Sequence, residues 1–295
     1  MGPSHTCALR QWMFRMKIPI YQVDAFTSEV FSGNPAAVCL LDDWISDSTL
    51  QAIAAENNLS ETAFMVRESD GFELRWFTPA TEVALCGHAT LASAYVLFEL
   101  RGWRQSAVSF KTRKSGRLIV EKKGDLFEMD FPSRPPTSKL PAAADLPLED
   151  ALGGNDFTLQ GFTGMLGLAP TKVLGSEEDI LAVLENEQRV RDLAPNLAAL
   201  ARMDCRGLIV TARGDSADFV SRFFAPAVGV PEDPVTGSSH CVLVPYWAGV
   251  LKKESLHAIQ VSKRGGELFC RHRGSRVSIA GKAALYLEGV ITIQS

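Results

Sequence analysis

Residues 75–80 read Arg-Trp-Phe-Thr-Pro-Ala, and residues 222–227 read Arg-Phe-Phe-Ala-Pro-Ala. Each copy follows a segment with helical pattern and then one with strand pattern. Each copy also precedes a glycine, Gly87 or Gly237, that opens an apolar helical stretch. The spacing from proline to glycine differs by three residues, so one loop carries an insertion. Two matching successions of elements indicate duplication of one unit. They predict two similar lobes related by a pseudo-twofold axis.

Strand and helix patterns on both sides of the repeat predict an α+β protein. The predicted strands span residues 18–26, 36–41, 59–66, 72–77, 108–112, 117–121, 126–131, 157–160, 172–174, 208–211, 219–224, 258–261, 267–271, 276–279 and 284–288. The first helix is expected to begin with a capping box of Ser48 and Gln51 and to end at Asn57-Asn58. Further helices are predicted at residues 89–100, 177–184, 195–202 and 239–248.

Composition divides the chain at one proline-rich stretch. Residues 132–147 hold five prolines and little periodicity, which is typical of a linker. We therefore expect an N-terminal extension at 1–15, a first lobe at 16–131, this linker, and a second lobe at 148–295. The last strand of the second lobe is free to pair with the first lobe.

Charge and cysteine usage restrict the class of protein. The 295 residues carry a net charge of −4, without the basic surface that nucleic-acid binding needs, so we expect a small-molecule or protein partner. The six cysteines are scattered and form no Cys-x-x-Cys pair, which favours reduced thiols. No apolar run reaches the ~20 residues needed to span a bilayer. We expect a cytoplasmic protein, although Arg10 and Arg15 leave an organelle-targeting segment open.

The two glycine-led helix starts are candidate anion sites. The first turn of a helix has free N–H groups and about half a positive charge, and glycine lets a ligand approach the backbone closely. Gly87 and Gly237 facing each other could hold a carboxylate on one side and a developing enolate on the other. This arrangement suits proton abstraction next to a carbonyl and needs no metal.

Glu61 is the candidate proton carrier. It shares a strand face with Ala63 and Met65, and a carboxylate on an apolar face should have a raised pKa. The second copy has Arg206-Gly207-Leu208 in the corresponding stretch, without a carboxylate. The alternative is a strand-end glutamate paired with an arginine in solvent.

Other polar residues surround the two helix starts. His88 could bind a carboxylate or relay a proton, or merely donate to a nearby carbonyl; Cys86 could be a base, although a buried thiol is the simpler role. Asp233 could accept from substrate or could cap a turn, and Ser238 could take an anion. A zinc site of Cys86, His88, His240 and Cys241 has none of the usual ligand spacings. Phosphate-binding glycine motifs are absent from the sequence.

Five motifs in order resemble those of the phenazine-biosynthesis isomerase-like (PhzF-like) family. They are Gly33-Asn34-Pro35-Ala36-Ala37-Val38, Asn58-Leu59-Ser60-Glu61-Thr62-Ala63-Phe64, Arg75-Trp76-Phe77-Thr78-Pro79, Cys86-Gly87-His88-Ala89-Thr90 and Glu232-Asp233-Pro234-Val235-Thr236-Gly237-Ser238. The resemblance runs from about Ile18 to the C-terminus. It implies the diaminopimelate-epimerase fold, in which each of two lobes wraps a mixed, barrel-like sheet around a central helix.

The resemblance also implies a site and a reaction. It implies a cofactor-free isomerase, usually a homodimer, with Glu61 as proton shuttle on a small carboxylate substrate. His88 and Asp233 would be catalytic partners. Gly87, Gly237, Ser238 and Thr236 would bind substrate, and no metal would be held. The related epimerases use two facing cysteines, whereas Thr236 stands here opposite Cys86, which argues against two-thiol racemisation.

Two other functions are also compatible with the sequence. One is a protein-interaction role with a vestigial site, since some animal members of the family are known chiefly as interaction partners. The other is an epimerase that uses Cys86 together with Glu61.

Overall fold

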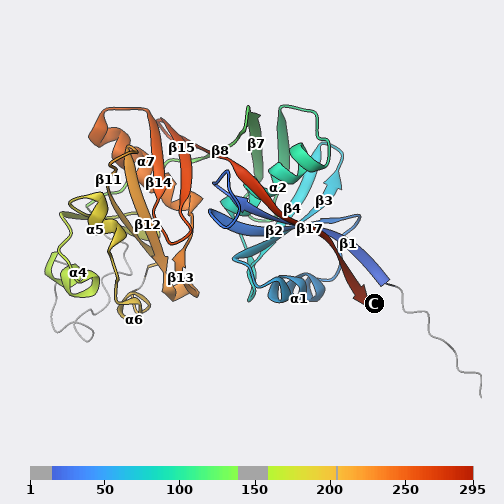
Figure 1. Cartoon of the computed structure of the whole chain (residues 1–295), viewed down its shortest axis with the longest axis horizontal. Coiled ribbons are helices and arrows are strands. Elements are labelled where there is room, and N and C mark those ends of the chain that lie inside the picture. Colours follow the sequence, from blue (N-terminus) through green and yellow to red (C-terminus); the bar gives the residue numbers. More distant parts are fainter. Residues whose placement is uncertain (1–14, 139–158, 204, 295) are drawn as a thin grey trace, which may run out of the picture.

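The computed structural model describes residues 15–138, 159–203 and 205–294, which form two lobes side by side (Figure 1). The predicted extension at 1–15 therefore lies outside the described residues except for Arg15, as do residues 139–147 of the predicted linker.

The first lobe contains most of the first half of the chain. Its elements are β1 (Arg15–Ala25), β2 (Asn34–Leu41), α1 (Asp47–Asn57), β3 (Glu61–Glu68), β4 (Gly71–Phe77), β5 (Glu82–Val83), α2 (Gly87–Tyr95), the π-helical segment η1 (Val96–Leu100), β6 (Ala107–Lys111), β7 (Arg117–Lys123) and β8 (Leu126–Pro132).

The second lobe repeats this succession. Its elements are α4 (Leu159–Leu166), β9 (Lys172–Gly175), β10 (Asp179–Val183), α5 (Glu187–Arg191), α6 (Leu197–Leu200), β11 (Gly207–Arg213), β12 (Phe219–Ala225), the 3-10 turn η3 (Pro226–Val228), β13 (Val230–Asp233), α7 (Gly237–Leu251), β14 (Ser255–Gln260), β15 (Gly266–Arg273) and β16 (Arg276–Gly281).

Strand pairing shows that the two lobes have the same topology. In the first lobe β2 runs parallel to β3, β3 antiparallel to β4, and β4 parallel to β6. In the second lobe β10, β11, β12 and β14 are related in the same way. The lobes join where β8 pairs with its own counterpart β16, with Met129 opposite Ile279. A pseudo-twofold axis between these two strands accounts for the repeat.

In each lobe the strands surround one buried helix. Residues 88–94 of α2 are all buried, and so are most residues of α7. A helix that is buried all round belongs to the interior of its lobe. In both lobes this central helix starts at a glycine near the lobe interface, as the repeat predicts.

The repeated arginine closes the same loop twice. Arg75 forms two hydrogen bonds to Glu82, at 2.7 and 2.8 Å, and Arg222 forms two to Glu232, at 2.7 and 2.9 Å. A paired guanidinium and carboxylate hold the strand to the segment that leads into the central helix. The repeated motif is therefore structural, and it fixes where each helix begins.

The last strand crosses between the lobes. After β16, the strand β17 (Ala283–Gln294) runs antiparallel along β1, from Ala283 opposite Ala25 to Gln294 opposite Arg15 (Figure 1). In the part of the chain that the structure describes, no helix is both long and apolar enough to cross a membrane.

Two predicted elements are wrong. Residues 177–184 were predicted as a helix, but 179–183 form β10, because all five side chains are buried beside parallel β11. Of the strand predicted at 157–160, residues 159–160 begin α4, and 157–158 lie outside the described residues.

The start of α1 also differs from its prediction. Its N-cap is Ser46, whose hydroxyl accepts the N–H of Thr49 at 3.2 Å. Gln51 does not close a capping box with Ser48; its side chain donates instead to the carbonyl of Thr78. The predicted stop at Asn57-Asn58 is confirmed, with Asn58 in the left-handed region.

Candidate active site

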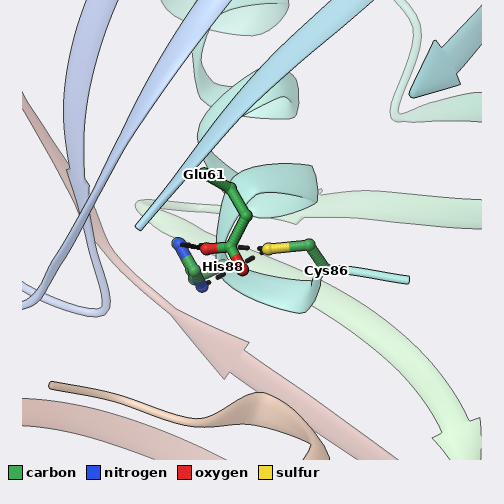
Figure 2. A group of neighbouring side chains, drawn as sticks. All are labelled: Glu61, Cys86 and His88. Atoms are coloured by element: carbon green, nitrogen blue, oxygen red, sulfur yellow. Dashed lines mark hydrogen bonds and ion pairs between the residues drawn. The ribbon is translucent and has the colours of Figure 1, made fainter. Parts of the chain in front are cut away.

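Glu61 and His88 meet at the lobe interface. Glu61 is the first residue of β3, and His88 is the second residue of α2. Oε2 of Glu61 lies 3.1 Å from Nε2 of His88, and both side chains are largely buried (Figure 2). The sequence places these two residues 27 positions apart, and the fold brings them into contact because β3 and α2 both start at this interface.

The pKa values of both residues are shifted in the direction that favours their ionised forms. Burial alone would raise the pKa of Glu61, but the charge of His88 and polar contacts with His88 and Cys86 outweigh it and lower the pKa. Burial lowers the pKa of His88, but Cys86 and Glu61 raise it well above its ordinary value. The prediction of a raised Glu61 pKa is therefore wrong, because apolar strand neighbours count for less than one imidazolium in direct contact.

Cys86 lies beside this pair but stays protonated. Its Sγ atom is 3.5 Å from Nδ1 of His88 (Figure 2). Burial, and next the nearby Glu61 carboxylate, raise the pKa of Cys86 to about 11. At neutral pH it is a thiol, so the negative charge that keeps the proton on His88 belongs to Glu61.

The second lobe supplies Asp233 through a residue that sequence reasoning did not single out. Nδ2 of Asn34 donates to Oδ1 of Asp233 at 2.8 Å and to the carbonyl of Val235 at 2.9 Å, and it lies 3.2 Å from Nδ1 of His88. Asn34 thus links His88, the partner of Glu61 in the first lobe, to Asp233 in the second. The Asn-Pro turn at Asn34 was the available signal, but a turn residue carries no indication of its distant partner.

Burial has the largest effect on the pKa of Asp233. It raises the pKa of this carboxyl, with a smaller contribution from Glu61, and the contacts with His88, Thr236 and Asn34 do not cancel the effect. The Thr236 hydroxyl donates to Oδ2 of Asp233 at 2.5 Å, and the Thr236 N–H donates to Gln260 at 2.9 Å. Both donors of Thr236 are engaged within the protein, so Thr236 orients Asp233.

The two helix starts face each other at the axis. A Cβ atom built on Gly87 would lie 3.9 Å from the Cα of Gly237, and the reverse distance is the same. The N-cap residues, Cys86 and Thr236, form no side-chain capping hydrogen bond, so the first turns present N–H groups to an anion. Ser238 follows Gly237, and its hydroxyl accepts from Nη1 of Arg206 at 3.0 Å, which leaves the hydroxyl proton free to donate.

Glu61 has no counterpart in the second lobe. The pairings of Thr62 with Phe77 and of Leu208 with Phe224 make Gly207 the equivalent of Glu61. A Cβ at Gly207 would come within 2.5 Å of the Phe223 ring, so no side chain fits there. The site is therefore one-sided, with its ionised pair in the first lobe only.

One cluster among the described residues has the types of ligand atom that could hold a metal ion. Ligand atoms of Glu61, Cys86 and His88 all lie within 4.8 Å of one another. His240 and Cys241 are not part of it: Nδ1 of His240 donates to the carbonyl of Thr236 at 2.8 Å, and burial lowers the pKa of His240 to about 4. Metal binding at the cluster would have to displace the protons of His88 and Cys86.

Comparisons with known proteins identify the family. Residues 23–289 match the model of the phenazine biosynthesis-like proteins. A Pseudomonas aeruginosa protein named as an uncharacterized isomerase is 52% identical over 278 residues, covering 94% of this chain and 100% of its own. The Homo sapiens phenazine biosynthesis-like domain-containing protein is 41% identical over 299 residues, covering 94% of this chain and 100% of its own.

Solved structures agree with the fold. A PhzF-family protein of Enterococcus faecalis superposes with a TM-score of 0.82 at 43% identity, covering 94% of this chain and 99% of its own. A hydroxyproline epimerase of Agrobacterium vitis, solved with trans-4-hydroxy-L-proline, superposes with a TM-score of 0.57 at 8% identity, covering 96% and 94%. The second likeness shows the fold alone.

The two-lobed fold and these relatives define an isomerase with a diaminopimelate-epimerase-like architecture, which confirms the predicted fold class. The chain belongs to the PhzF-like family of phenazine biosynthesis-like proteins.

Proposed function

We propose that this isomerase moves a proton on a small carboxylate substrate, with Glu61 as the acid and base and without a cofactor. The supporting observation is the contact between Glu61 and His88, whose Oε2 and Nε2 atoms lie 3.1 Å apart at the start of a buried helix. A carboxylate held ionised is ready to accept a proton, and an adjacent imidazolium stabilises negative charge that develops nearby.

The proposed reaction has two steps on one residue. In the first, a substrate C–H bond breaks and an O–H bond forms on Glu61, while the electron pair moves into the conjugated carboxylate system of the substrate. In the second, Glu61 returns the proton to a different carbon. The enzyme ends as it began, and the product is an isomer of the substrate.

The remaining residues are proposed to hold the substrate. The uncapped first turns at Gly87 and Gly237, with the Ser238 hydroxyl, present donors to a carboxylate from both sides. Asp233, whose pKa is raised by burial, retains a proton more readily than an exposed aspartate and is placed to donate to substrate oxygen. Asn34 fixes its distance from His88.

The test measures the incorporation of solvent deuterium into a panel of small unsaturated carboxylates. Proton NMR in D₂O detects this incorporation. Glu61→Gln should lose incorporation by about 10²-fold or more, which is the usual contribution of general acid–base catalysis. Glu68→Gln, at the other end of β3 and paired with exposed Lys111, is the matched control and should keep full activity. Retained exchange in Glu61→Gln would refute the assignment.

Cys86→Ala distinguishes the epimerase alternative. Because the thiol stays protonated at neutral pH, its loss should reduce the rate only a few-fold. A loss as large as that of Glu61→Gln would instead show a two-base mechanism that uses Cys86.

A further inference from the structure

A pocket lies in the first lobe, away from the residues of the candidate active site. It has a volume of about 650 Å³, which is within the range of small-molecule sites. Its walls come from the start of β1, the end of β2, the end of β3 and the loop after η1. This is the opposite end of the lobe from the catalytic pair.

The rise per residue of a strand and of a helix gives the distance between this pocket and the candidate active site. Arg67 lines the pocket and lies six residues along β3 from Glu61, which corresponds to about 20 Å. Leu97 also lines it and lies ten residues along the central helix from Gly87, which corresponds to about 15 Å. A ligand in this pocket would therefore not touch Glu61 or His88.

Three aromatic side chains form part of the wall. Trp44, Phe72 and Trp103 all line the pocket. The Trp44 indole N–H donates to Glu73 at 2.8 Å, and that of Trp103 donates to the carbonyl of Ala107 at 2.9 Å. Because both N–H groups are engaged within the protein, these residues meet a ligand through ring atoms, beside the guanidinium groups of Arg75 and Arg67, which lie 5.2 Å from the centre of the Trp44 ring and 5.0 Å from that of Trp103.

Arg67 supplies a charge that is held in place by aromatic contacts. Its guanidinium carbon lies 5.2 Å from the centre of the Phe72 ring and 5.0 Å from that of Trp103. Cation–π contact uses the flat face of the guanidinium and leaves its N–H edge free. A planar edge of paired donors is the geometry that recognises a carboxylate.

The other charges of the wall leave a small positive excess. Lys17 and Arg101 also line the pocket, against two carboxylates, Asp42 and Asp43. Among the residues that the structure describes, none of these five charged side chains forms an ion pair. Three cations against two anions favour a ligand with one negative charge over a dianion.

The helix changes its winding where it reaches the pocket. In the π-helical segment η1 the N–H of Arg101 donates to the carbonyl of Val96 at 3.0 Å, and the N–H of Trp103 then donates to Leu97 at 2.9 Å. π-Helical turns are rare and occur frequently at functional sites. Here the turn brings three wall residues, Leu97, Arg101 and Trp103, to one pocket.

We propose that this pocket is a second binding site, and that its ligand is a planar aromatic monocarboxylate. The ring would lie against Trp44 and Trp103, and the carboxylate would pair with the free edge of Arg67. Among the described residues that line the pocket there is no carboxylate–imidazole pair like Glu61 and His88, so we assign the site to binding and not to conversion of its ligand.

Isothermal calorimetry with 2-naphthoate tests this site. Wild-type protein should bind one equivalent of 2-naphthoate. The neutral 2-naphthamide and the dianionic 2-naphthyl phosphate should each bind with an affinity lower by about tenfold or more. Arg67→Met, which keeps the apolar stem, should weaken 2-naphthoate about tenfold or more, with Arg67→Lys between the two. Arg271→Met in the second lobe is the matched surface control and should bind as wild type does.

Glu61→Gln separates this site from the catalytic one. Binding of 2-naphthoate should be the same in Glu61→Gln as in wild type. Loss of binding in that variant would place the probe in the catalytic site and overturn the proposal. Equal affinity for acid and amide, no saturable binding, or unchanged binding in a folded Arg67→Met would each overturn it as well.

Discussion

Gly87 and Gly237 stand so close at the pseudo-twofold axis that a methyl group on either would lie 3.9 Å from the Cα of the other. Each glycine is the first residue of the buried helix of its lobe. The space between them is where the positive ends of two helix dipoles converge. Any side chain here would occupy the position proposed for the substrate carboxylate.

Gly237→Ala should therefore lose activity without losing the fold. A Cβ at 3.9 Å makes ordinary contact, so the unfolding temperature should stay within about 2 °C of wild type. Deuterium incorporation should fall about tenfold or more, because the methyl group fills the space between the helix starts. Gly249→Ala, in the last turns of the same helix and with nothing within 4 Å of the added Cβ, is the control. This control should keep its activity and gain about 0.5–1 kcal/mol of unfolding free energy. Full activity in Gly237→Ala would contradict the proposed position of the substrate carboxylate between the two helix starts.

The proton on His88 should depend on Glu61. In wild type the imidazole should titrate well above its ordinary pKa of 6.5, because Cys86 and the Glu61 carboxylate together outweigh burial. In Glu61→Gln burial should dominate and His88 should titrate below 6.5. Carbon-detected NMR titration of the histidine rings measures both values. His240, with its pKa lowered to about 4 by burial, should not move between the two proteins and serves as the internal reference.

The same two shifts define a pH window for stability. A depressed Glu61 pKa gives stability that is present above the unfolded value near 4.5 and lost as pH falls through the folded value. A raised His88 pKa gives stability that is present below 6.5 and lost as pH rises through the folded value. The pair should therefore stabilise the protein most between these two unfolded values. A stability difference between wild type and Glu61→Gln that grows above neutral pH would contradict the assignment of charge.

The sequence predicted the duplication and most strands because local patterns and the repeat agree. Strand 72–77 and the helix from 89 both appear close to their predicted bounds, and both repeated arginines form the same carboxylate pair. The prediction failed at β10, where five consecutive residues of the predicted helix are buried beside a parallel strand. Tertiary burial there overrides local propensity, and no window of sequence contains the partner strand.

The candidate site was predictable in its residues but not in its charges. Motif resemblance named Glu61, His88, Asp233 and Ser238. Alternation along a strand suggested a raised Glu61 pKa, because it shows only the neighbours on the same face. The decisive neighbour, His88, comes from another element, and so does Asn34, whose contacts join residues 199 and 201 positions away. Contacts of this range are set by the fold.

Metal removal should leave the activity unchanged. The raised pKa of His88 and that of Cys86 at about 11 keep protons on two of the three ligand atoms in the Glu61 cluster at neutral pH. Protein dialysed against EDTA should therefore incorporate deuterium at the wild-type rate. Added Zn²⁺ should inhibit, because it would take the Glu61 carboxylate, and inhibition should strengthen as pH rises. Loss of activity on chelation, with recovery on adding Zn²⁺, would show that the cluster is a catalytic metal site instead.

Arg264 should hold the two lobes together through a buried carboxylate. It lies between β14 and β15, and its Nη2 is 2.8 Å from Oδ1 of Asp24 in β1. It also donates to the carbonyls of Ser32 and Gly33, both at 2.8 Å. Burial raises the pKa of Asp24 despite the Phe31 N–H and Arg264, which lower it. Removing Arg264 would leave this carboxylate buried without its cation.

Arg264→Met should lose about 3 kcal/mol of unfolding free energy at neutral pH, the usual cost of leaving a buried charge unpaired. An aspartate whose folded pKa is raised destabilises the fold above that pKa and not below its unfolded value. Without Arg264, which lowers the pKa of Asp24, that pKa should rise further. The unfolding free energy lost in Arg264→Met should therefore become smaller as the pH falls through this pKa. Urea unfolding at about pH 5 and about pH 7.5 measures this slope. The double variant Asp24→Asn with Arg264→Met removes the stranded charge and should recover most of the loss at the higher pH; a double variant as unstable as the single one would show that Arg264 acts only through the Ser32 and Gly33 carbonyls.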